Sequence, residues 1–445
     1  MDQELARLGH ALSAIHGAAV AATRADRAAD RNVRLEGDRL RLGEGSVSLR
    51  GDRKIWVVGG GKAAAQVAAV LEVKVGSRIA GGLIVVKDGH GLPLPNIEVV
   101  EAAHPVPDER GEAAAQRVLA MVSEIPEDDL LIVVLTGGGS ALLAAPADGI
   151  TLEDKVTVTD QLLRAGAEIE EINAVRKHLS AIKGGLLARA ARPKEIVTLL
   201  VSDVLGDPPD VIASGPTAGD ATRFSTAQAV LKRYSLWEEV PARVRTRIEA
   251  GVRGDIAETP RPDDARIAGV RHVLLANNAA ALNAAERQAD ELGYETIRLT
   301  SRLRGEAKEA GRFFGALAWE AAQRGDAVCF LAGGEVTVTL DRMGLGGRCQ
   351  ELALSAAREM DGLRRPVVLL AAGTDGTDGP TDAAGAFATP RTWSRAFSSG
   401  IDPEKGLREH DAYPVLRATA DLFVTGPTGT NVLDLYLILA GDPDR

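Results

Sequence analysis

The amino-acid sequence predicts an α/β protein of two domains, each with three layers, and a doubly wound parallel sheet in the N-terminal domain. Three observations predict this class. Short apolar runs alternate with alanine-rich helical stretches over most of the chain. The run Leu130–Leu135 is apolar throughout, which is typical of a strand buried on both faces. The length of 445 residues exceeds what a single hydrophobic core usually supports.

The first half of the chain begins with an expected helix, because Leu5, Leu8, Leu12 and Ile15 recur at helical spacing. Strands are then expected at 54–58, 82–86, 97–102, 130–135 and 195–202. Helices are expected at 62–71, 110–125, 152–165, 172–190, 227–234 and 241–250. This order of strands and helices predicts parallel strands with helices packed on the sheet.

The same alternation resumes in the second half. Strands are expected at 272–276, 295–299, 327–331, 335–340, 367–371 and 421–424, and helices at 279–292, 306–323 and 351–360. The strand at 335–340 alternates polar and apolar residues, which favours a half-exposed position. Between the halves, the segment 252–266 is polar and contains two prolines. We therefore expect an N-terminal domain at 1–251, a linker at 252–266 and a C-terminal domain at 267–445.

Composition excludes several classes of function. Acidic residues outnumber basic ones by 62 to 52, and aromatic residues make up only 3% of the chain, which disfavours a nucleic-acid surface. Two cysteines, Cys329 and Cys349, are too few for a disulfide framework or a four-thiolate zinc site. No apolar run is long enough for a membrane helix, and the N-terminus lacks the pattern of a signal peptide. A cytoplasmic protein without a membrane partner is expected.

Most of the glycine clusters follow an expected strand, and the ends of parallel strands are where ligands of such sheets bind. Several glycine turns on one chain indicate a ligand with several phosphates or carboxylates, although tight packing of strand on helix is the competing explanation. The residues assigned to the nucleotide on this basis are Gly59, Gly60, Gly61, Gly137, Gly138, Gly139, Ser140, Gly334 and Glu335.

The first glycine cluster is not a P-loop, because Gly61-Lys62 is followed by Ala63 and not by Ser or Thr. It does match the GxGxxA variant of the dinucleotide fingerprint, which makes the N-terminal domain Rossmann-like. The acid that binds a ribose in such folds would be Asp88. Lys62 lies in the first turn of the following helix, where its charge is unfavourable unless the ligand is strongly anionic.

Other candidates for chemistry are acids and cations at strand ends. Asp203 follows the strand at 195–202 and could accept a proton or hold Mg²⁺. Asp375 and Asp378 lie in the glycine-rich segment 373–379 and offer hard oxygen ligands for Mg²⁺. Arg348 stands at a glycine-bracketed helix start, and arginine is the preferred planar partner of phosphate and carboxylate.

A basic helical stretch also stands out. Asn173, Arg176 and Lys177 fall close together at helical spacing, with His178 and Lys183 nearby. His178 is a candidate acid or base, and an ion-paired structural histidine is the competing reading. No Ser-His-Asp arrangement and no metal-binding spacing of His or Cys is evident in the sequence.

Taken together, these motifs resemble the class II glycerate 2-kinases, the family with a C-terminal MOFRL domain. The matching segments run in order along nearly the whole chain: VVGGGKAA (57–64), HPVPDERG (104–111), LTGGGSALL (135–143), EINAVRKHLSAIKGG (171–185), VSDVLGD (201–207), SGPT (214–217), LAGGEVTVTL (331–340), GLGGRCQELAL (344–354), AAGTDGTDGPTDAAGA (371–386) and TGPTGTNVLDL (425–435).

The resemblance implies ATP-dependent phosphorylation of D-glycerate, mainly at the 2-hydroxyl, with Mg²⁺. It implies an active site in a cleft between two α/β domains. The active-site lysine and arginine proposed for the family fall on Lys62 and Arg348. The residue after this arginine is usually Asn in the family and is Cys349 here, which removes an amide donor and acceptor.

On this basis Lys62 and Arg348 would neutralise the transferring phosphate and the glycerate carboxylate, and Asp203 would orient or deprotonate the attacking hydroxyl. Asp375 and Asp378 would anchor Mg²⁺. Two other readings stay open: an NAD(P)H-dependent hydroxypyruvate reductase, which the GxGxxA match favours, and a non-catalytic sensor of phosphosugars or nucleotides. A homodimeric assembly is also left open.

Overall fold

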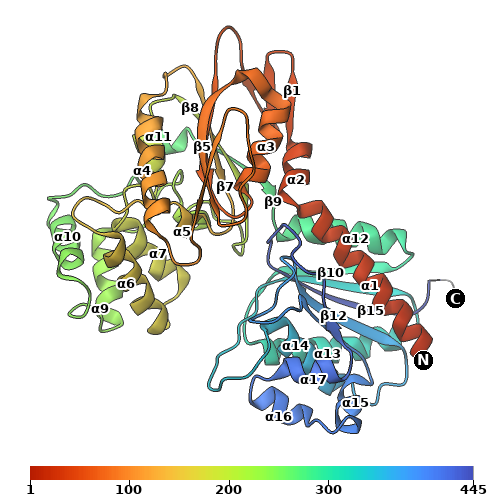
Figure 1. Ribbon diagram of the computed structural model, residues 1–445. Helices are drawn as coiled ribbons and strands as arrows, with labels where there is room; N and C mark the ends of the chain where they lie inside the picture. Colours follow the sequence, from red (N-terminus) through yellow and green to blue (C-terminus); the bar gives the residue numbers. More distant parts are fainter. Residues whose placement is uncertain (444–445) are drawn as a thin grey trace. The chain divides into compact units, whose positions relative to one another are not determined.

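The computed structural model describes residues 1–443 and divides the chain into two compact units. One unit combines Met1–Arg27 with Ala276–Arg445 and is called the terminal unit here. The other, Ala28–Leu275, is called the inserted unit because the terminal unit flanks it in the sequence. Figure 1 shows both units as α/β folds, each with one large sheet.

This division differs from the expected one at the N-terminus. The first helix, α1 (Asp2–Thr23), packs on α12 (Asn278–Glu291) and on two strands of the terminal unit. It does so because its apolar face, which includes Leu8 and Leu12, is buried there. Helical spacing revealed that face, but it carries no information about which sheet the face covers.

The boundary segment 252–266 also differs from the expectation of a linker, because it is fastened into the inserted unit. Thr259 Oγ1 donates to Oδ2 of the buried Asp220 at 2.9 Å, and the Asp220 N–H donates to the carbonyl of Pro260 at 2.8 Å. The guanidinium of Arg261 donates to the Asp220 carbonyl at 3.0 Å. A polar, proline-bearing composition is common both to linkers and to loops that polar contacts hold in place.

The large sheet of the inserted unit has the strand order β6-β5-β4-β7-β8-β9. Numbered along the chain, this is the order 3-2-1-4-5-6 of a doubly wound dinucleotide-binding sheet. The pairs from β6 to β8 are parallel. The strands are β4 (Ile55–Gly60), β5 (Ile79–Lys87), β6 (Glu98–Ala102), β7 (Leu130–Leu135), β8 (Glu195–Val201) and β9 (Arg271–Ala276). The sequence predicted all six, whereas it missed the small antiparallel sheet of β1 (Val33–Glu36), β2 (Arg39–Leu42) and β3 (Gly45–Ser48).

Helices cover this sheet on both faces, as Figure 1 shows for α3 and α4. The helices are α2 (Ala25–Asn32), which begins in the terminal unit, α3 (Ala64–Val75), α4 (Glu109–Glu124), α5 (Gly139–Leu142), α6 (Leu152–Arg164), α7 (Ile169–His178), α8 (Leu186–Ala190), α9 (Phe224–Arg233), α10 (Ala242–Arg253) and α11 (Ala265–Ala268). The single helix predicted at 172–190 is wrong, because α7 ends at His178 and α8 begins only at Leu186, after Gly184 and Gly185, whose φ angles are positive at 58° and 82°. Helices α6, α7, α9 and α10 share a separate apolar core.

The sheet of the terminal unit is mixed, with the order β10-β11-β15-β12-β13-β14. Only β10 and β11 pair in parallel. The strands are β10 (Glu295–Leu303), β11 (Val328–Gly334), β12 (Val367–Gly373), β13 (Gly385–Ala388), β14 (Leu422–Phe423) and β15 (Asp434–Ala440). The sequence missed the fully buried β15, and its strand at 335–340 is wrong, because Thr337 makes only an isolated bridge to Glu306.

Helices α13 (Ala307–Arg324) and α14 (Arg348–Met360) fill one face of this sheet, where their buried residues form the main core of the unit. Helices α1 and α12 lie on the other face (Figure 1). Three short helices complete the unit: α15 (Thr392–Ser398), α16 (Pro403–Arg408) and α17 (Ala412–Ala418). Both units are therefore three-layered, as expected.

Candidate functional site

Three polar side chains converge on one glycine turn of the inserted unit. Lys62 and Asp203 were predicted site residues, and His104 was not. This turn, Gly137-Gly138, follows the buried strand β7. A methyl group added at Gly137 would lie 2.3 Å from Oδ2 of Asp203, and one added at Gly138 would lie 2.9 Å from Nε2 of His104 and 3.4 Å from Cγ of Lys62. The absence of a side chain at both positions is what lets the three groups approach.

The electrostatics of this turn suit an anionic ligand. Among residues 1–443, no carboxylate lies within ion-pair distance of the Lys62 ammonium, so its charge is available to a ligand. Burial, followed by the charge of Lys62, lowers the pKa of His104 to about 4, so this imidazole is neutral at pH 7. Burial raises the pKa of Asp203, against smaller lowering by a backbone hydrogen bond and by Lys62.

Close packing leaves no room for a side chain at Gly59 or Gly61, at the end of β4. Gly59 and Gly61 have φ angles of 145° and 137°, and a methyl group would lie 1.9 Å from the Val134 carbonyl oxygen at the first and 2.1 Å from Thr136 Oγ1 at the second. The Lys62 N–H donates to the carbonyl of Gly137 at 2.9 Å, which fixes the lysine beside the other turn. The glycine cluster thus positions Lys62 by close strand packing.

Ser140 links the same turn to a chain of buried polar groups. Its Oγ lies 2.8 Å from Oγ of Ser214, which donates to Oδ1 of Asn173 on α7 at 2.9 Å. The buried Lys183 ammonium donates to the Ser140 carbonyl at 2.6 Å and to its hydroxyl at 3.0 Å. These hydrogen bonds tie Ser140, which follows the Gly137-Gly138 turn, to groups from the basic stretch.

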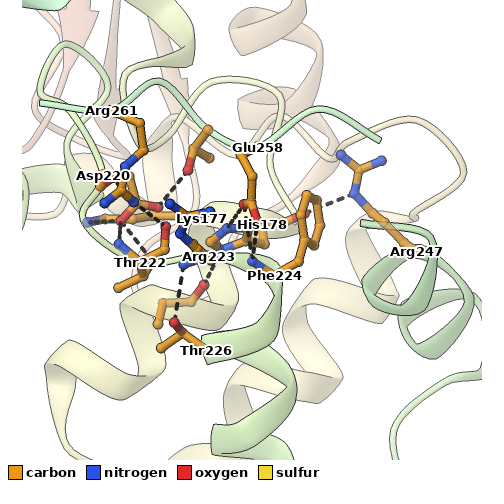
Figure 2. Close-up of polar contacts among 12 residues, drawn as sticks. Lys177, His178, Asp220, Thr222, Arg223, Phe224, Thr226, Arg247, Glu258 and Arg261 are labelled. Atoms are coloured by element: carbon orange, nitrogen blue, oxygen red, sulfur yellow. Dashed lines mark hydrogen bonds and ion pairs between the residues drawn. The ribbon is translucent and has the colours of Figure 1, made fainter. Parts of the chain in front are cut away.

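Two other residues of that basic stretch, Lys177 and His178, have carboxylate partners, as Figure 2 shows. The buried Lys177 ammonium lies 3.3 Å from Asp220 and 3.4 Å from Asp210. His178 Nε2 lies 3.2 Å from Glu258, and its ring packs edge-on against Phe224. The reading of His178 as an ion-paired core histidine fits this geometry, and both side chains tie α7 to loop carboxylates of the inserted unit.

In the terminal unit, the expected catalytic cation is Arg348, the first residue of α14. Its Nε and Nη2 donate to the two carboxylate oxygens of the buried Asp434 at 2.6 and 2.9 Å, and its Nη1 lies 2.9 Å from Glu335. Burial alone would lower the pKa of Arg348, but the hydrogen bonds and charge of Asp434 raise it above its usual range. The predicted nucleotide residue Glu335, directly after β11, therefore meets Arg348.

The two predicted metal ligands have different surroundings. Both oxygens of Asp378 accept main-chain N–H groups, from Cys349 at 3.1 Å and Gln350 at 2.8 Å, so this buried carboxylate caps α14. Burial raises its pKa to about 6. Asp375 accepts one bond on Oδ1, from the Thr377 N–H at 3.0 Å. Among residues 1–443, no group of three or more His, Cys, Asp or Glu side chains is arranged to hold a metal ion.

A pocket of about 580 Å³ opens beside these residues within the terminal unit, a volume that suits a small organic ligand. Its lining includes Glu335, Arg348, Asp375 and His410. Cys349 is fully buried, and burial raises its thiol pKa well above the usual value, so it is not a reactive thiol at neutral pH. Asp88, the candidate ribose-binding acid, is held by Arg110 at 2.7 and 2.9 Å.

Sequence reasoning missed three residues of these sites. His104 appeared only inside the segment HPVPDERG, and Ser214 only inside SGPT, so their residue types were visible but their partners were not. Asp434 begins the strand β15, which was not recognised at all. A carboxylate directly before the apolar run LYLILA is the signal that points to it. The cleft between domains stays a prediction of the resemblance.

Two family models match this chain, one mostly over the inserted unit and one within the terminal unit. The family model described as a domain of unknown function (DUF4147) matches residues 11–249, and the MOFRL family model matches residues 328–434. Among residues 1–443, none of the helices combines the length and apolar character that a bilayer span requires.

Three similar proteins illustrate the relationship. The chain is 41% identical over 428 residues to a glycerate 2-kinase of Pyrococcus horikoshii, covering 95% of each chain. It is 44% identical over 391 residues to an Agrobacterium vitis protein provisionally named as a hydroxypyruvate reductase, covering 86% of this chain and 87% of that one. A crystal structure of glycerate kinase from Thermotoga maritima superposes with a TM-score of 0.83 at 37% identity, covering 96% of this chain and 98% of the other.

Proposed function

This chain belongs to the glycerate 2-kinase family and is a kinase of glycerate with a nucleotide phosphate donor, and on that premise we propose that it transfers the γ-phosphate of ATP to the 2-hydroxyl of D-glycerate with Mg²⁺. The observation that carries the residue assignments is the convergence of Lys62, Asp203 and His104 on the Gly137-Gly138 turn. Phosphoryl transfer needs positioning and charge neutralisation more than covalent catalysis, and this turn offers both.

Lys62 supplies the positive charge in the inserted unit. Its ammonium is unpaired by any carboxylate among the described residues, while its main chain is fixed to Gly137. Asp203 is the group that orients or deprotonates the attacking hydroxyl, because it lies against the same turn and its raised pKa gives it greater affinity for a proton than an exposed aspartate has. His104 is neutral at pH 7 and can therefore donate or accept a hydrogen bond without repelling Lys62.

Arg348 supplies charge in the terminal unit. Asp434 holds its guanidinium in one orientation through two hydrogen bonds, whereas the partner at Nη1, Glu335, has a side chain that is 42% exposed. An incoming phosphate would compete with Glu335 more easily than with the buried Asp434. We propose that Asp434 keeps the arginine aimed at the ligand and that Glu335 gives way to it.

Asp375 is the residue that fits Mg²⁺. Magnesium commonly takes one or two protein carboxylates together with phosphate oxygens and water, so a three-carboxylate cage is not required. Asp375 faces the pocket and has one oxygen, Oδ2, without a hydrogen bond to residues 1–443. Asp378 fits less well, because both of its oxygens already accept main-chain hydrogen bonds. When bound, the metal ion would neutralise charge on the phosphates of the nucleotide.

The deciding experiment incubates the pure protein with ATP, Mg²⁺ and D-glycerate and follows the products by phosphorus NMR. The proposal expects 2-phosphoglycerate and ADP. Formation of 3-phosphoglycerate would overturn the assignment of the 2-hydroxyl, and the absence of any transfer would overturn the kinase function. A parallel reaction without added metal, in the presence of a chelator, tests the requirement for Mg²⁺.

A hydroxypyruvate reductase is the second candidate, since the GxGxxA turn follows the first strand of a sheet with dinucleotide-binding order. Against it, Asp88 is already engaged by Arg110. Lys62 lies before α3, which begins at Ala64 and not at residue 62 as expected, and it adds a positive charge beside the GxGxxA turn. NADH oxidation at 340 nm with hydroxypyruvate separates the two activities. A non-catalytic sensor would bind nucleotide without releasing ADP. The cytoplasmic location and a homodimeric assembly stay predictions.

A further inference from the structure

Arg176 is a cation of the inserted unit that the proposed reaction has not used. It lies on α7 between the apolar Val175 and Lys177. Lys177 has two carboxylate partners. Among residues 1–443, no carboxylate lies within ion-pair distance of the Arg176 guanidinium, and no hydrogen bond to it is made. A partly buried guanidinium without any partner is unusual, because burial of charge is normally compensated.

Two buried lysines share this lack of a carboxylate. Lys183 is 1% exposed and donates only to the carbonyl and hydroxyl of Ser140. Lys155 is 8% exposed and its ammonium lies 3.3 Å from the carbonyl of Ala145. Neutral oxygen atoms hold both ammonium groups in place but do not cancel their charges. The protein thus buries two lysine ammonium groups without a carboxylate in ion-pair distance among residues 1–443, although its net charge is −10.

The three charges affect one another. Burial, and then the charge of Arg176, lowers the pKa of Lys155 to about 7. Burial, and then the charges of Arg176 and Lys155, lowers the pKa of Lys183 well below its usual value. Each positive charge therefore makes the others less favourable, and an anion beside Arg176 would relieve all three.

The local backbone brings hydroxyl groups to the same place. Asn173 and Arg176 are three residues apart on α7 and so lie on one face of it. Asn173 accepts from Ser214, whose hydroxyl meets that of Ser140. Ala213 and Ser214 have positive φ angles of 52° and 61°, a costly conformation that non-glycine residues keep where the surroundings demand it. Ser140 in turn follows the turn that holds Lys62.

We propose that Arg176 binds the carboxylate of the substrate acid, with Lys155 and Lys183 supplying positive potential behind it. This assignment rests on the proposed function and deepens it, since it identifies the group that distinguishes glycerate from an uncharged polyol. A carboxylate is planar and matches the fork of a guanidinium with two parallel hydrogen bonds. Lys62, beside Gly137 and Gly138, stays available for the phosphate.

The test compares the wild type with Arg176→Met and Arg176→Lys on two acceptors, D-glycerate and its uncharged amide, D-glyceramide. Arg176→Met should raise KM for D-glycerate about 10²-fold and leave KM for ATP unchanged, because a charged hydrogen-bonding partner of the substrate is lost. The preference for D-glycerate over the amide should fall by the same factor. Arg176→Lys should recover part of both, because it restores the charge without the planar fork.

Stability provides a readout independent of activity. If Arg176 only held the fold together, Arg176→Met would lower Tm. Because the guanidinium has no partner in the part of the chain that the structure describes, we expect the ligand-free variant to unfold at an equal or higher temperature than the wild type, by up to about 2–4 °C. The matched control is Arg164→Met on α6, an arginine that pairs with Asp160 on the surface and should change neither Tm nor KM.

Binding of D-glycerate and of inorganic phosphate by calorimetry, without nucleotide, separates the outcomes. Loss of D-glycerate binding in Arg176→Met supports the carboxylate site even if the wild type proves not to transfer phosphate. Retained binding and unchanged KM for D-glycerate overturn it while the kinase function stands. A rise in KM for ATP, or loss of phosphate binding alone, would show that the site serves a phosphate and would also overturn the proposal.

Discussion

Asp434 and Arg348 form a two-pronged ion pair in which both carboxylate oxygens receive N–H groups of the guanidinium, at 2.6 and 2.9 Å. The carboxylate is 1% exposed and also accepts from the hydroxyl of Tyr436 at 3.0 Å. The arginine cannot leave this position without stranding a buried charge. The position of the guanidinium is therefore built into the start of β15.

Substitution of Asp434 by asparagine should lower activity, although Asp434 is not proposed to contact the substrate. The variant turns one acceptor oxygen into a donor that faces the guanidinium, so Arg348 should shift and kcat should fall about 10²-fold. Loss of a hydrogen bond to a charged group should cost about 1.5–3 kcal/mol of stability. Steady-state kinetics and chemical denaturation measure the two effects. Glu335→Gln is the comparison, and a loss of kcat as large as that of Asp434→Asn would contradict the different roles assigned to the two acids.

Replacement of Lys62 by methionine should lower kcat about 10³-fold or more, which corresponds to about 4 kcal/mol of lost transition-state stabilisation. Tm should change little, because no ion pair to the ammonium is broken among the described residues. The control is Lys194→Met, a surface lysine that pairs with Glu127. Near-native turnover in Lys62→Met would exclude the lysine from the reaction.

Gly137→Ala tests the position of Asp203 without changing the acid itself. The new methyl group would overlap Oδ2 of Asp203, so the carboxylate must rotate away at a cost of about 1 kcal/mol. We expect kcat to fall to the value of Asp203→Asn, and the double variant to show no further loss, because both changes remove the same interaction. Additive losses would mean that Gly137 matters for another reason. Gly269→Ala, which meets only ordinary contacts, is the control.

His16 on α1 should make the terminal unit sensitive to acid. Its ring is buried beside Phe423 with Nε2 unpartnered, and burial lowers its pKa to about 4. Between pH 6.5 and 4 the unfolded histidine gains a proton that the folded one does not, so the free energy of unfolding falls as the pH falls. The loss at pH 4 is on the order of 3 kcal/mol.

Unfolding by denaturant at pH 7 and pH 4.5 checks this prediction against His16→Leu. The wild type should lose more stability than the variant over this range. His104 also has a pKa of about 4, but it is present in both proteins and cancels in the comparison. Equal losses in the two proteins would show that His16 does not carry the effect.

The sequence predicted the sheet of the inserted unit well because its central strands β4 and β7 are buried apolar runs that end in glycine turns. It also predicted that Lys62, Asp203 and the turn at 137–140 belong together, since parallel strands end at one edge. The strand β15 was missed although it lies in the middle of its sheet. Its chain neighbours are a glycine-rich segment and the C-terminus, so no alternation of strand and helix marked it.

The sequence also did not reveal which groups the charged side chains would pair with in the fold. Lys177 and Arg176 are adjacent cations on one helix, and their residue types give no indication that one has two carboxylate partners and the other none. Asp378 was expected to hold a metal ion, but its place beside the start of α14 makes it a helix cap. Both distinctions depend on residues more than 25 positions away in the chain, which local spacing does not reveal.

The nesting of one unit within the other affects how the chain emerges from the ribosome. Helix α1 is synthesised first, but α12, on which it packs, follows roughly 250 residues later. At about 5–20 residues per second, the apolar stripe of α1 waits for about 12–50 s before its docking surface exists. The nascent protein therefore carries an unpacked amphipathic helix while its middle portion is already free to collapse.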